Sequence, residues 1–325
     1  CKSLLGLDDL NQLTKIDRDD LKENLLIGKT HPELKHLDLP SNKNPNSIFK
    51  ILRKKNILLH HPYDLFKTSV EEFINRAADD PLVMAIKITL YRVSQDSPII
   101  AALMRAAENG KEVMTLVELK ARFDEDNNIQ WAKQLEQAGI HVVYGIIGFK
   151  THTKIALTVR KEKGRLRNYF HIGTGNYNSN TSKFYTDLGL LSTDPDIASD
   201  LLELFNYLSG FSKQKSYQKL LVSPSSMREK FIFLIKREIK NAEEGKKAEI
   251  IAKMNSLVDP EIIKLLYLAS HTGVKISLII RGICCLYPQR KNLSENIKVI
   301  SIIGHFLEHS RIFWFCNNDD NEVFI

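Results

Sequence analysis

The sequence has few cysteines and no long apolar segment. Four of its 325 residues are cysteine, and the adjacent pair Cys284 and Cys285 does not have the spacing of a zinc site. Such sparse use is typical of reduced thiols in a cytoplasmic protein. The longest apolar stretch, residues 274–286, is interrupted by Lys275 and Arg281 and is far shorter than the ~20 residues of a membrane helix. We therefore expect no transmembrane segment.

The usual signals at the chain ends are also missing. The sequence starts at Cys1 without an initiator methionine, and no signal peptide follows. It stops within residues 322–325, which resemble the middle of a strand. We expect the chain to be a fragment of a longer protein.

Acidic residues are outnumbered, so the chain carries a formal net charge of +7. A basic surface suits a polyanion, such as nucleic acid, an acidic membrane or a phosphate polymer. It leaves peripheral membrane association open. The alternative is a solvated surface with an excess of lysine, and composition does not separate the two.

The pattern along the chain predicts two α/β domains. Residues 1–39 form a partial helical segment, and turn formers in residues 40–47 indicate a linker. We place the first catalytic domain at residues 40–219 and a second, truncated one at residues 220–325. Alternating strands and helices favour an α/β fold with mixed sheets. We predict strands at residues 83–90, 113–119, 141–145, 154–159, 168–172, 248–254 and 274–280, and helices at 98–109, 127–138, 227–244 and 259–270.

The second half repeats the plan of the first. In each half a helix ends at a glycine, Gly110 or Gly273, and a strand follows. An arginine lies near the end of each of these strands, and a triplet of histidine, any residue and a basic residue comes later. The triplets begin at His152 and His309 and end at Lys154 and Arg311. Two similar halves with one triplet each predict a single site at their interface.

The segment Lys150–Lys154 carries the clearest chemistry. In an extended chain Lys150, His152 and Lys154 point to one face. A neutral imidazole is a nucleophile toward phosphorus, and ammonium groups beside it offset the charge of phosphoryl oxygens. The alternative is a solvated basic edge strand. His309 is a candidate acid or stabiliser opposite His152.

The paired triplets resemble those of the phospholipase D superfamily, in which two such motifs meet between domains. That family places an aspartate where this sequence has Val159, and a lysine where it has Arg311. These departures weaken a phosphodiesterase interpretation.

The chain from Ile48 onward is more similar to the polyphosphate kinase family. The resemblance is specific because seven motifs occur together. They are Ile57–Tyr63, Thr89–Arg92, Leu119–Glu125, Lys150–Lys154, His171–Asn178, Tyr185–Asp187 and Phe306–Arg311.

The family resemblance implies a role for individual residues. His152 would be the phosphorylated nucleophile, and His309 would bind nucleotide phosphates or assist transfer. The implied nucleotide contacts also include Lys154, Tyr185 and Arg281.

The family assigns magnesium to the positions of Arg92 and Arg122. A guanidinium has no acceptor, so we expect both to bind phosphate oxygens, with Mg²⁺ nearby. The alternatives are ordinary strand-end salt bridges for these arginines and a core position for Tyr185. Residues 173–176 either cradle phosphate or form a tight turn.

The resemblance implies a polyphosphate kinase with two phospholipase D-like domains. Its substrates would be ATP and polyphosphate, its cofactor Mg²⁺, and its assembly a homo-oligomer without nucleic acid. Two other hypotheses stay open: a phospholipase D-type phosphodiesterase or nuclease, and a non-catalytic module that binds polyanions.

Overall fold

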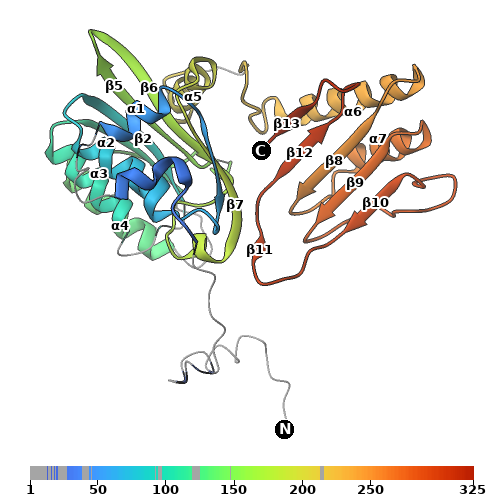
Figure 1. Cartoon of the computed structure of the whole chain (residues 1–325), viewed down its shortest axis with the longest axis horizontal. Helices are drawn as coiled ribbons and strands as arrows, with labels where there is room; N and C mark the ends of the chain where they lie inside the picture. Colours follow the sequence, from blue (N-terminus) through green and yellow to red (C-terminus); the bar gives the residue numbers. More distant parts are fainter. Residues whose placement is uncertain are drawn as a thin grey trace.

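The chain folds into two α/β units, which confirms the predicted fold class (Figure 1). We call residues 28–212 the first unit and residues 216–325 the second unit. The computed structural model describes residues 13, 16, 18, 20, 28–38, 44, 46–91, 93, 97–118, 125–146, 148–212 and 216–325, without the side chains of residues 125–129.

The first unit is built on a mixed sheet with the strand order β1-β7-β6-β5-β2-β3-β4. Strands β2, β3 and β4 are parallel neighbours, whereas β5, β6, β7 and β1 are each antiparallel to the next. The strands are β1 (Ile57–His61), β2 (Val83–Leu90), β3 (Glu112–Val117), β4 (His141–Val143), β5 (Ile155–Glu162), β6 (Arg165–Gly173) and β7 (Tyr185–Ser192).

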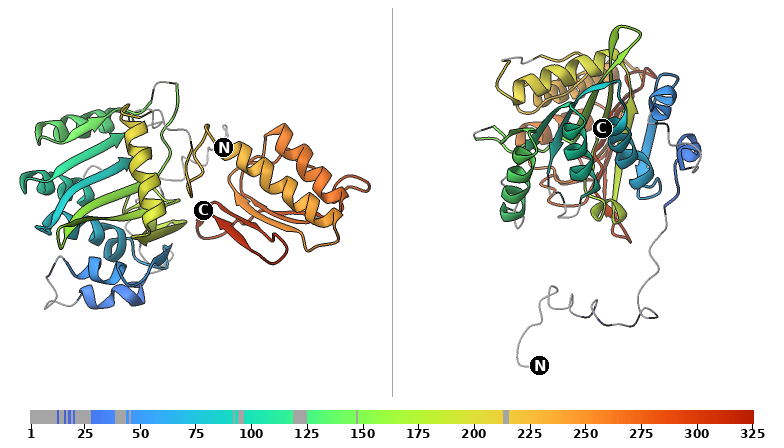
Figure 2. Two further views of the ribbon diagram at one scale, coloured as in Figure 1. Left: turned by 90° about the horizontal axis from the view of Figure 1, so that it is seen from above. Right: turned by 90° about the vertical axis from the view of Figure 1, so that its left-hand side faces the viewer.

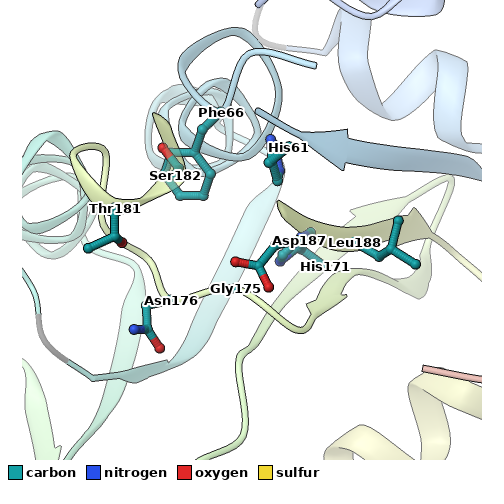
Figure 3. Close-up of a pocket in the computed structure, with 9 residues that line it drawn as sticks. All are labelled: His61, Phe66, His171, Gly175, Asn176, Thr181, Ser182, Asp187 and Leu188. Carbon is teal, nitrogen blue, oxygen red and sulfur yellow. The ribbon is translucent and has the colours of Figure 1, made fainter. Parts of the chain in front are cut away.

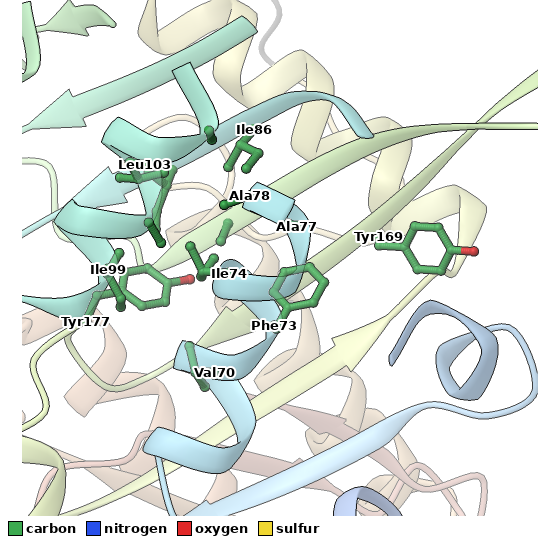
Figure 4. Close-up of a cluster of buried hydrophobic side chains, with 14 of the residues drawn as sticks. Val70, Phe73, Ile74, Ala77, Ala78, Ile86, Ile99, Leu103, Tyr169 and Tyr177 are labelled. Atoms are coloured by element: carbon green, nitrogen blue, oxygen red, sulfur yellow. The ribbon is translucent and has the colours of Figure 1, made fainter. Parts of the chain in front are cut away.

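Helices cover both faces of this sheet. Residues of α1 to α4 form one apolar cluster with the sheet, and α5 forms another with its opposite face. Figure 4 shows Phe73, Ile74 and Ala77 of α2 within the first cluster, which also contains Tyr177. The helical segments are η3 (Pro32–Asp38), α1 (Ser47–Leu52), the π-helix η4 (Lys67–Glu71), α2 (Glu72–Asp79), α3 (Pro98–Glu108), α4 (Glu125–Gln137), η5 (Thr181–Lys183) and α5 (Pro195–Leu208).

The second unit has a sheet with the order β10-β9-β8-β12-β13. Strands β8, β9 and β10 are parallel, and β12 and β13 are antiparallel additions. Both α6 and α7 cover one face of this sheet (Figure 2). The elements are α6 (Met227–Glu243), β8 (Glu249–Met254), α7 (Pro260–His271), β9 (Lys275–Ile280), β10 (Ile297–Ile300), β12 (Ile312–Phe315) and β13 (Glu322–Phe324).

The start of α7 follows from its sequence. The Asp259 carboxylate accepts hydrogen bonds from the backbone N–H groups of Glu261 and Ile262 at 3.0 and 3.1 Å. Pro260 occupies the first turn, where its missing N–H costs nothing. Asp259 therefore caps the N-terminus of α7.

The two units repeat one another around the histidine triplets. In the first unit, β2 lies between the parallel strand β3 and the antiparallel strand β5. In the second unit, β8 lies in the same way between the parallel strand β9 and the antiparallel strand β12. His152 precedes the antiparallel strand β5, which begins at Ile155. His309 precedes β12, which begins at Ile312, at the same spacing. The fold therefore gives both histidines the same structural position.

A short strand of the second unit joins the sheet of the first. Strand β11 (Leu307–Glu308) pairs in parallel with Tyr185 and Thr186 of β7. The N–H of Ser310 continues the contact by donating to the Thr186 carbonyl at 2.9 Å. Residues just before and at His309 are thereby fixed against the first unit.

No helix within the described residues is long and apolar enough to cross a membrane.

Candidate active site

The segment that carries His152 is held by neighbouring side chains instead of a strand ladder. Residues 151–154 have no regular secondary structure. The Thr89 hydroxyl donates to the Thr153 carbonyl at 2.8 Å and accepts from the Ile155 N–H at 3.1 Å. The N–H of Thr151 donates to the buried Glu118 carboxylate at 2.6 Å. His152 therefore has a fixed backbone although it lies outside a strand, since β5 begins only at Ile155.

The imidazole of His152 is kept uncharged. Its side chain is open to solvent on one side, but the atoms packed around the rest remove water. This burial, followed by the nearby positive charge of Lys154, lowers the pKa of His152 to about 3. Weaker contributions come from Arg311, His309 and Lys150. The ring is therefore neutral at physiological pH, as a nucleophile must be.

The same contributions show that the two triplets meet. His309 and Arg311 of the second unit are close enough to His152 to lower its pKa. The hydrogen bond between His309 and Asp187 joins the second triplet to the first unit, and the single site between the halves stays a prediction. Lys154, which is buried, donates from Nζ to the His152 carbonyl.

His309 is oriented by a carboxylate of the first unit. Its Nδ1 lies 2.8 Å from Asp187 Oδ1, and because a carboxylate only accepts, Nδ1 carries the proton. The Thr174 hydroxyl donates to the same oxygen at 2.6 Å. The His309 ring also lies 5.1 Å from the Tyr185 ring, centroid to centroid. This arrangement leaves Nε2 of His309 for a ligand.

Two arginines of the second unit lie together near His309. Arg311 donates from Nη1 to the His309 carbonyl at 2.8 Å. Burial, and then the charge of Arg281, lower the pKa of Arg311. Within the described part of the chain, the buried Nε of Arg281 has no hydrogen-bond partner. Adjacent guanidinium groups with a free donor suit a phosphate ligand.

An ion pair within the second unit holds Glu308, which contacts the first unit through β11. Lys253 Nζ lies 2.5 Å from Glu308 Oε2 and donates to the Ser310 hydroxyl at 2.7 Å. Thr186 of the first unit donates to the same Glu308 carboxylate at 3.0 Å. Burial opposes ionisation of Glu308, but the hydrogen bonds from Lys253 and Thr186 hold its pKa below the ordinary value.

A small pocket is lined in part by Asp187. Its lining residues come from β1, β6, β7, η5 and the loops before η4 and η5 (Figure 3). Burial lowers the pKa of His61, and it lowers the pKa of His171 to about 3. The lining consists of His61, Phe66, His171, Gly175, Asn176, Thr181, Ser182, Asp187 and Leu188.

The turn at residues 173–176 packs against Asp187. A Cβ on Gly175 would lie 2.8 Å from the Asp187 carboxylate. Thr174 N–H donates to the Leu188 carbonyl at 2.9 Å, so it is already used. Close approach to Asp187 accounts for this glycine, and phosphate binding is not needed to explain it.

The predicted metal residues Arg92 and Arg122 lie outside the described residues. Among the residues that are described, no cluster of three histidine, cysteine, aspartate or glutamate side chains fits a metal ion.

Residue types alone did not give Thr89, Glu118, Thr174 or Asp187 the roles they have in the structure. Thr89, Thr174 and Asp187 lie in motifs that carry the family resemblance, whereas Glu118 lies outside them.

Two family models match nearly the whole described fold. Polyphosphate kinase C-terminal domain 1 matches residues 47–214, and polyphosphate kinase C-terminal domain 2 matches residues 220–325. The chain belongs to the polyphosphate kinase family. The predicted family is thereby confirmed.

Similar polyphosphate kinases agree with the family models. The chain is 64% identical over 331 residues to the polyphosphate kinase of Prochlorococcus marinus strain MIT 9313, covering 100% of the chain and 46% of that protein. It is 49% identical to the one of Streptomyces coelicolor, covering 99% of the chain and 43% of that protein. The chain thus spans about half the length of the curated relatives it matches.

Solved structures show the same architecture. The polyphosphate kinase from Porphyromonas gingivalis superposes with a TM-score of 0.84 and 38% identity, covering 99% of the chain and 52% of that structure. A phosphatidylserine synthase from Haemophilus influenzae superposes with a TM-score of 0.53 and 10% identity, covering 84% of the chain and 80% of that structure. The second likeness concerns the fold alone.

Proposed function

We propose that this polyphosphate kinase chain transfers the γ-phosphate of ATP to polyphosphate through a phosphohistidine at His152. The observation that carries the proposal is the group of cations near the His152 imidazole, Lys150 and Lys154 from its own unit and Arg311 from the other, which together with burial lower its pKa. A neutral nitrogen has a lone pair for attack, and the cations attract the phosphoryl oxygens.

The chemistry would occur in two half-reactions. In the first, an imidazole nitrogen of His152 attacks the γ-phosphorus, a P–N bond forms, and ADP leaves with the electrons of the broken P–O bond. In the second, a terminal oxygen of polyphosphate attacks the same phosphorus and the P–N bond breaks. The chain grows by one phosphate, and His152 is free again.

We assign supporting roles from the contacts at the site. His309, held by Asp187, would bind or protonate a phosphate oxygen through Nε2. Arg281 and Lys154 would contribute positive charge to the phosphates. Tyr185, beside the His309 ring, would contact the nucleotide. Residues 40–219 and 220–325 would act as the two catalytic domains.

The described donor set does not fit a Mg²⁺ ion held by the protein alone. Asp187, the carboxylate nearest His309, already accepts from Thr174 and His309. Arg92 and Arg122 offer no acceptor. We therefore assign no step to Mg²⁺, whose preferred oxygen ligands would come from the nucleotide phosphates.

Phosphate labelling tests the function directly. A chimera would carry this chain in place of the matching segment of the Prochlorococcus marinus polyphosphate kinase. With ATP labelled at the γ-phosphate, we expect an acid-labile, alkali-stable label on the protein that chases into polyphosphate. The His152→Ala variant should lose the label completely.

The matched control is His141→Ala, which replaces an exposed histidine at the start of β4 and should keep the label. A label that survives His152→Ala would refute the proposal. Hydrolysis of a phosphodiester without ATP would instead support a phosphodiesterase. Polyphosphate binding unaffected by His152→Ala, with no label in the parent, would support a binding module.

The remaining expectations concern the setting of the protein. A homo-oligomer and a cytoplasmic location, with or without peripheral membrane contact, stay predictions. Sedimentation of the chimera and cell fractionation would test them.

A further inference from the structure

The aromatic ring of Tyr91 contacts three members of the segment that carries His152. Tyr91 follows the last residue of β2 and is 7% exposed. The Lys150 and Lys154 ammonium nitrogens lie 5.2 and 5.0 Å from the centroid of its ring. The His152 ring lies 5.5 Å away at an interplanar angle of 65°. One side chain therefore touches the candidate nucleophile and both of its lysine neighbours.

These contacts have favourable geometry. The face of an aromatic ring attracts a cation within about 6 Å of its centroid. Rings that meet edge to face are also attracted to one another. The backbone keeps the partners in register, because Thr89, two residues before Tyr91, bonds to Thr153 and Ile155. The ring is thus fixed relative to His152.

Several cations gather at this site. Lys150, Lys154 and Arg311 are all near enough to His152 to lower its pKa, and like charges repel one another. An aromatic face attracts ammonium groups without adding a negative charge.

We propose that Tyr91 is a positioning residue that holds the Lys150 and Lys154 ammonium groups beside His152 through its aromatic face. Tyr91 acts through the lysines and has no contact with the reacting phosphorus. The proposal rests on phosphoryl transfer at His152 as described above. It assigns the effect to the electron density of the ring and not to the phenol hydroxyl.

Graded fluorination of the ring separates electron density from shape. Tyr91→Phe in the chimera should label at a rate within about twofold of the parent, because the face of the ring is retained. Phenylalanine carrying one, two and then five fluorines at position 91 should lower the initial labelling rate stepwise. The total loss should be on the order of tenfold, because fluorine removes the negative face that attracts cations.

Phe49 provides the matched control. Its ring lies 5.1 Å from the Arg160 guanidinium carbon, in the core of the first unit. The same fluorinated series at position 49 should lower the melting temperature and leave the labelling rate unchanged. A labelling rate that is constant across the series at position 91 would overturn the proposal. A Tyr91→Phe rate as low as that of the pentafluoro form would assign the role to the hydroxyl instead.

A second measurement does not depend on catalysis. Lysines of the chimera would be dimethylated with ¹³C, and the signals of the two lysines assigned with Lys150→Arg and Lys154→Arg. We expect both signals to be shifted upfield by the Tyr91 ring current and to move toward ordinary positions with pentafluorophenylalanine. Unshifted signals would refute the contact, whereas shifted signals without any phosphate label would refute only the transfer chemistry.

Discussion

His171 shows at the scale of single residues how little free space surrounds the site. A Cβ on Gly189 would lie 2.5 Å from His171 Nε2, and one on Gly173 would lie 3.0 Å from Cε1 of the same ring. The Tyr177 hydroxyl holds the other ring nitrogen at 2.9 Å. The imidazole is therefore clamped between two glycines, and any larger residue must displace it.

Gly189→Ala is expected to destabilise the chain by about 1–3 kcal/mol, because the added methyl group overlaps the His171 ring. Urea unfolding would measure the loss. Gly304→Ala is the matched control, since a Cβ there has no neighbour within 4 Å. That variant should stay within about 0.5 kcal/mol of the parent. Equal effects of the two changes would contradict the close contact.

Candidate residues could be predicted from the sequence where the residue type or its motif indicates a chemical role. The structure brings His152, His309, Arg281 and Tyr185 into one region, but their roles stay predictions. Asp187 went unassigned because its partner lies 122 residues away along the chain. Such a bond depends on how the units pack, and no local pattern encodes that packing.

At the scale of elements, periodicity predicted the regular segments. It failed where tertiary contacts determine whether a strand forms or where it begins. The strand at Val83–Leu90 was predicted with its observed bounds. Strand β7 was missed: it is largely buried on both faces, so polar and apolar residues do not alternate. The predicted extension of β5 back to Lys154 is wrong, because the Thr89 hydroxyl takes the place of a strand partner there.

The connection between the units is fixed by one carboxylate on α5. Asp200 is buried and accepts hydrogen bonds from the backbone N–H groups of Gln218, Lys219 and Leu220 at 3.0, 2.6 and 2.9 Å. Without this carboxylate, these three backbone N–H groups would lose their hydrogen-bond acceptor. Asp200 therefore sets the point from which the second unit departs.

Asp200→Ala should make the connection near residues 216–222 sensitive to proteases and lower stability by about 1–3 kcal/mol, since buried donors lose their acceptor. Limited trypsin digestion at Lys219, followed by mass spectrometry, would show the cut. The control Asp196→Ala, exposed on the same helix, should lose less than about 1 kcal/mol from the helix dipole. Equal protection in both variants would contradict the anchoring role.

At the scale of the whole molecule, buried neutral imidazoles make stability depend on pH. Burial lowers the pKa of His171 to about 3, whereas an unfolded histidine titrates near pH 6.5. Below pH ~6.5 the unfolded chain therefore binds more protons than the folded one. The contribution of the neutral His171 ring to the free energy of unfolding is fully present above pH ~6.5 and is lost as the pH falls toward 3.

The free energy of unfolding should be about 2 kcal/mol lower at pH 5 than at pH 7 from His171 alone. Denaturant titrations across this range would measure it. His171→Gln should flatten the pH dependence even if it lowers stability overall. The exposed His271→Gln provides the matched control, because it leaves the buried rings in place. If the free energy of unfolding of His171→Gln and of the parent changed with pH in parallel, His171 would be ruled out as the source of the pH dependence.

The bond between Asp187 and His309 also bears on how the molecule folds. Each sheet forms within its own unit, even where β1 pairs with β7 across more than a hundred residues, whereas β11 joins β7 from the other unit. Loop closure of this length is slow compared with local pairing. The bond between His309 and Asp187 needs, in addition, that the two units meet, so catalytic competence would depend on a docking step that neither sheet requires.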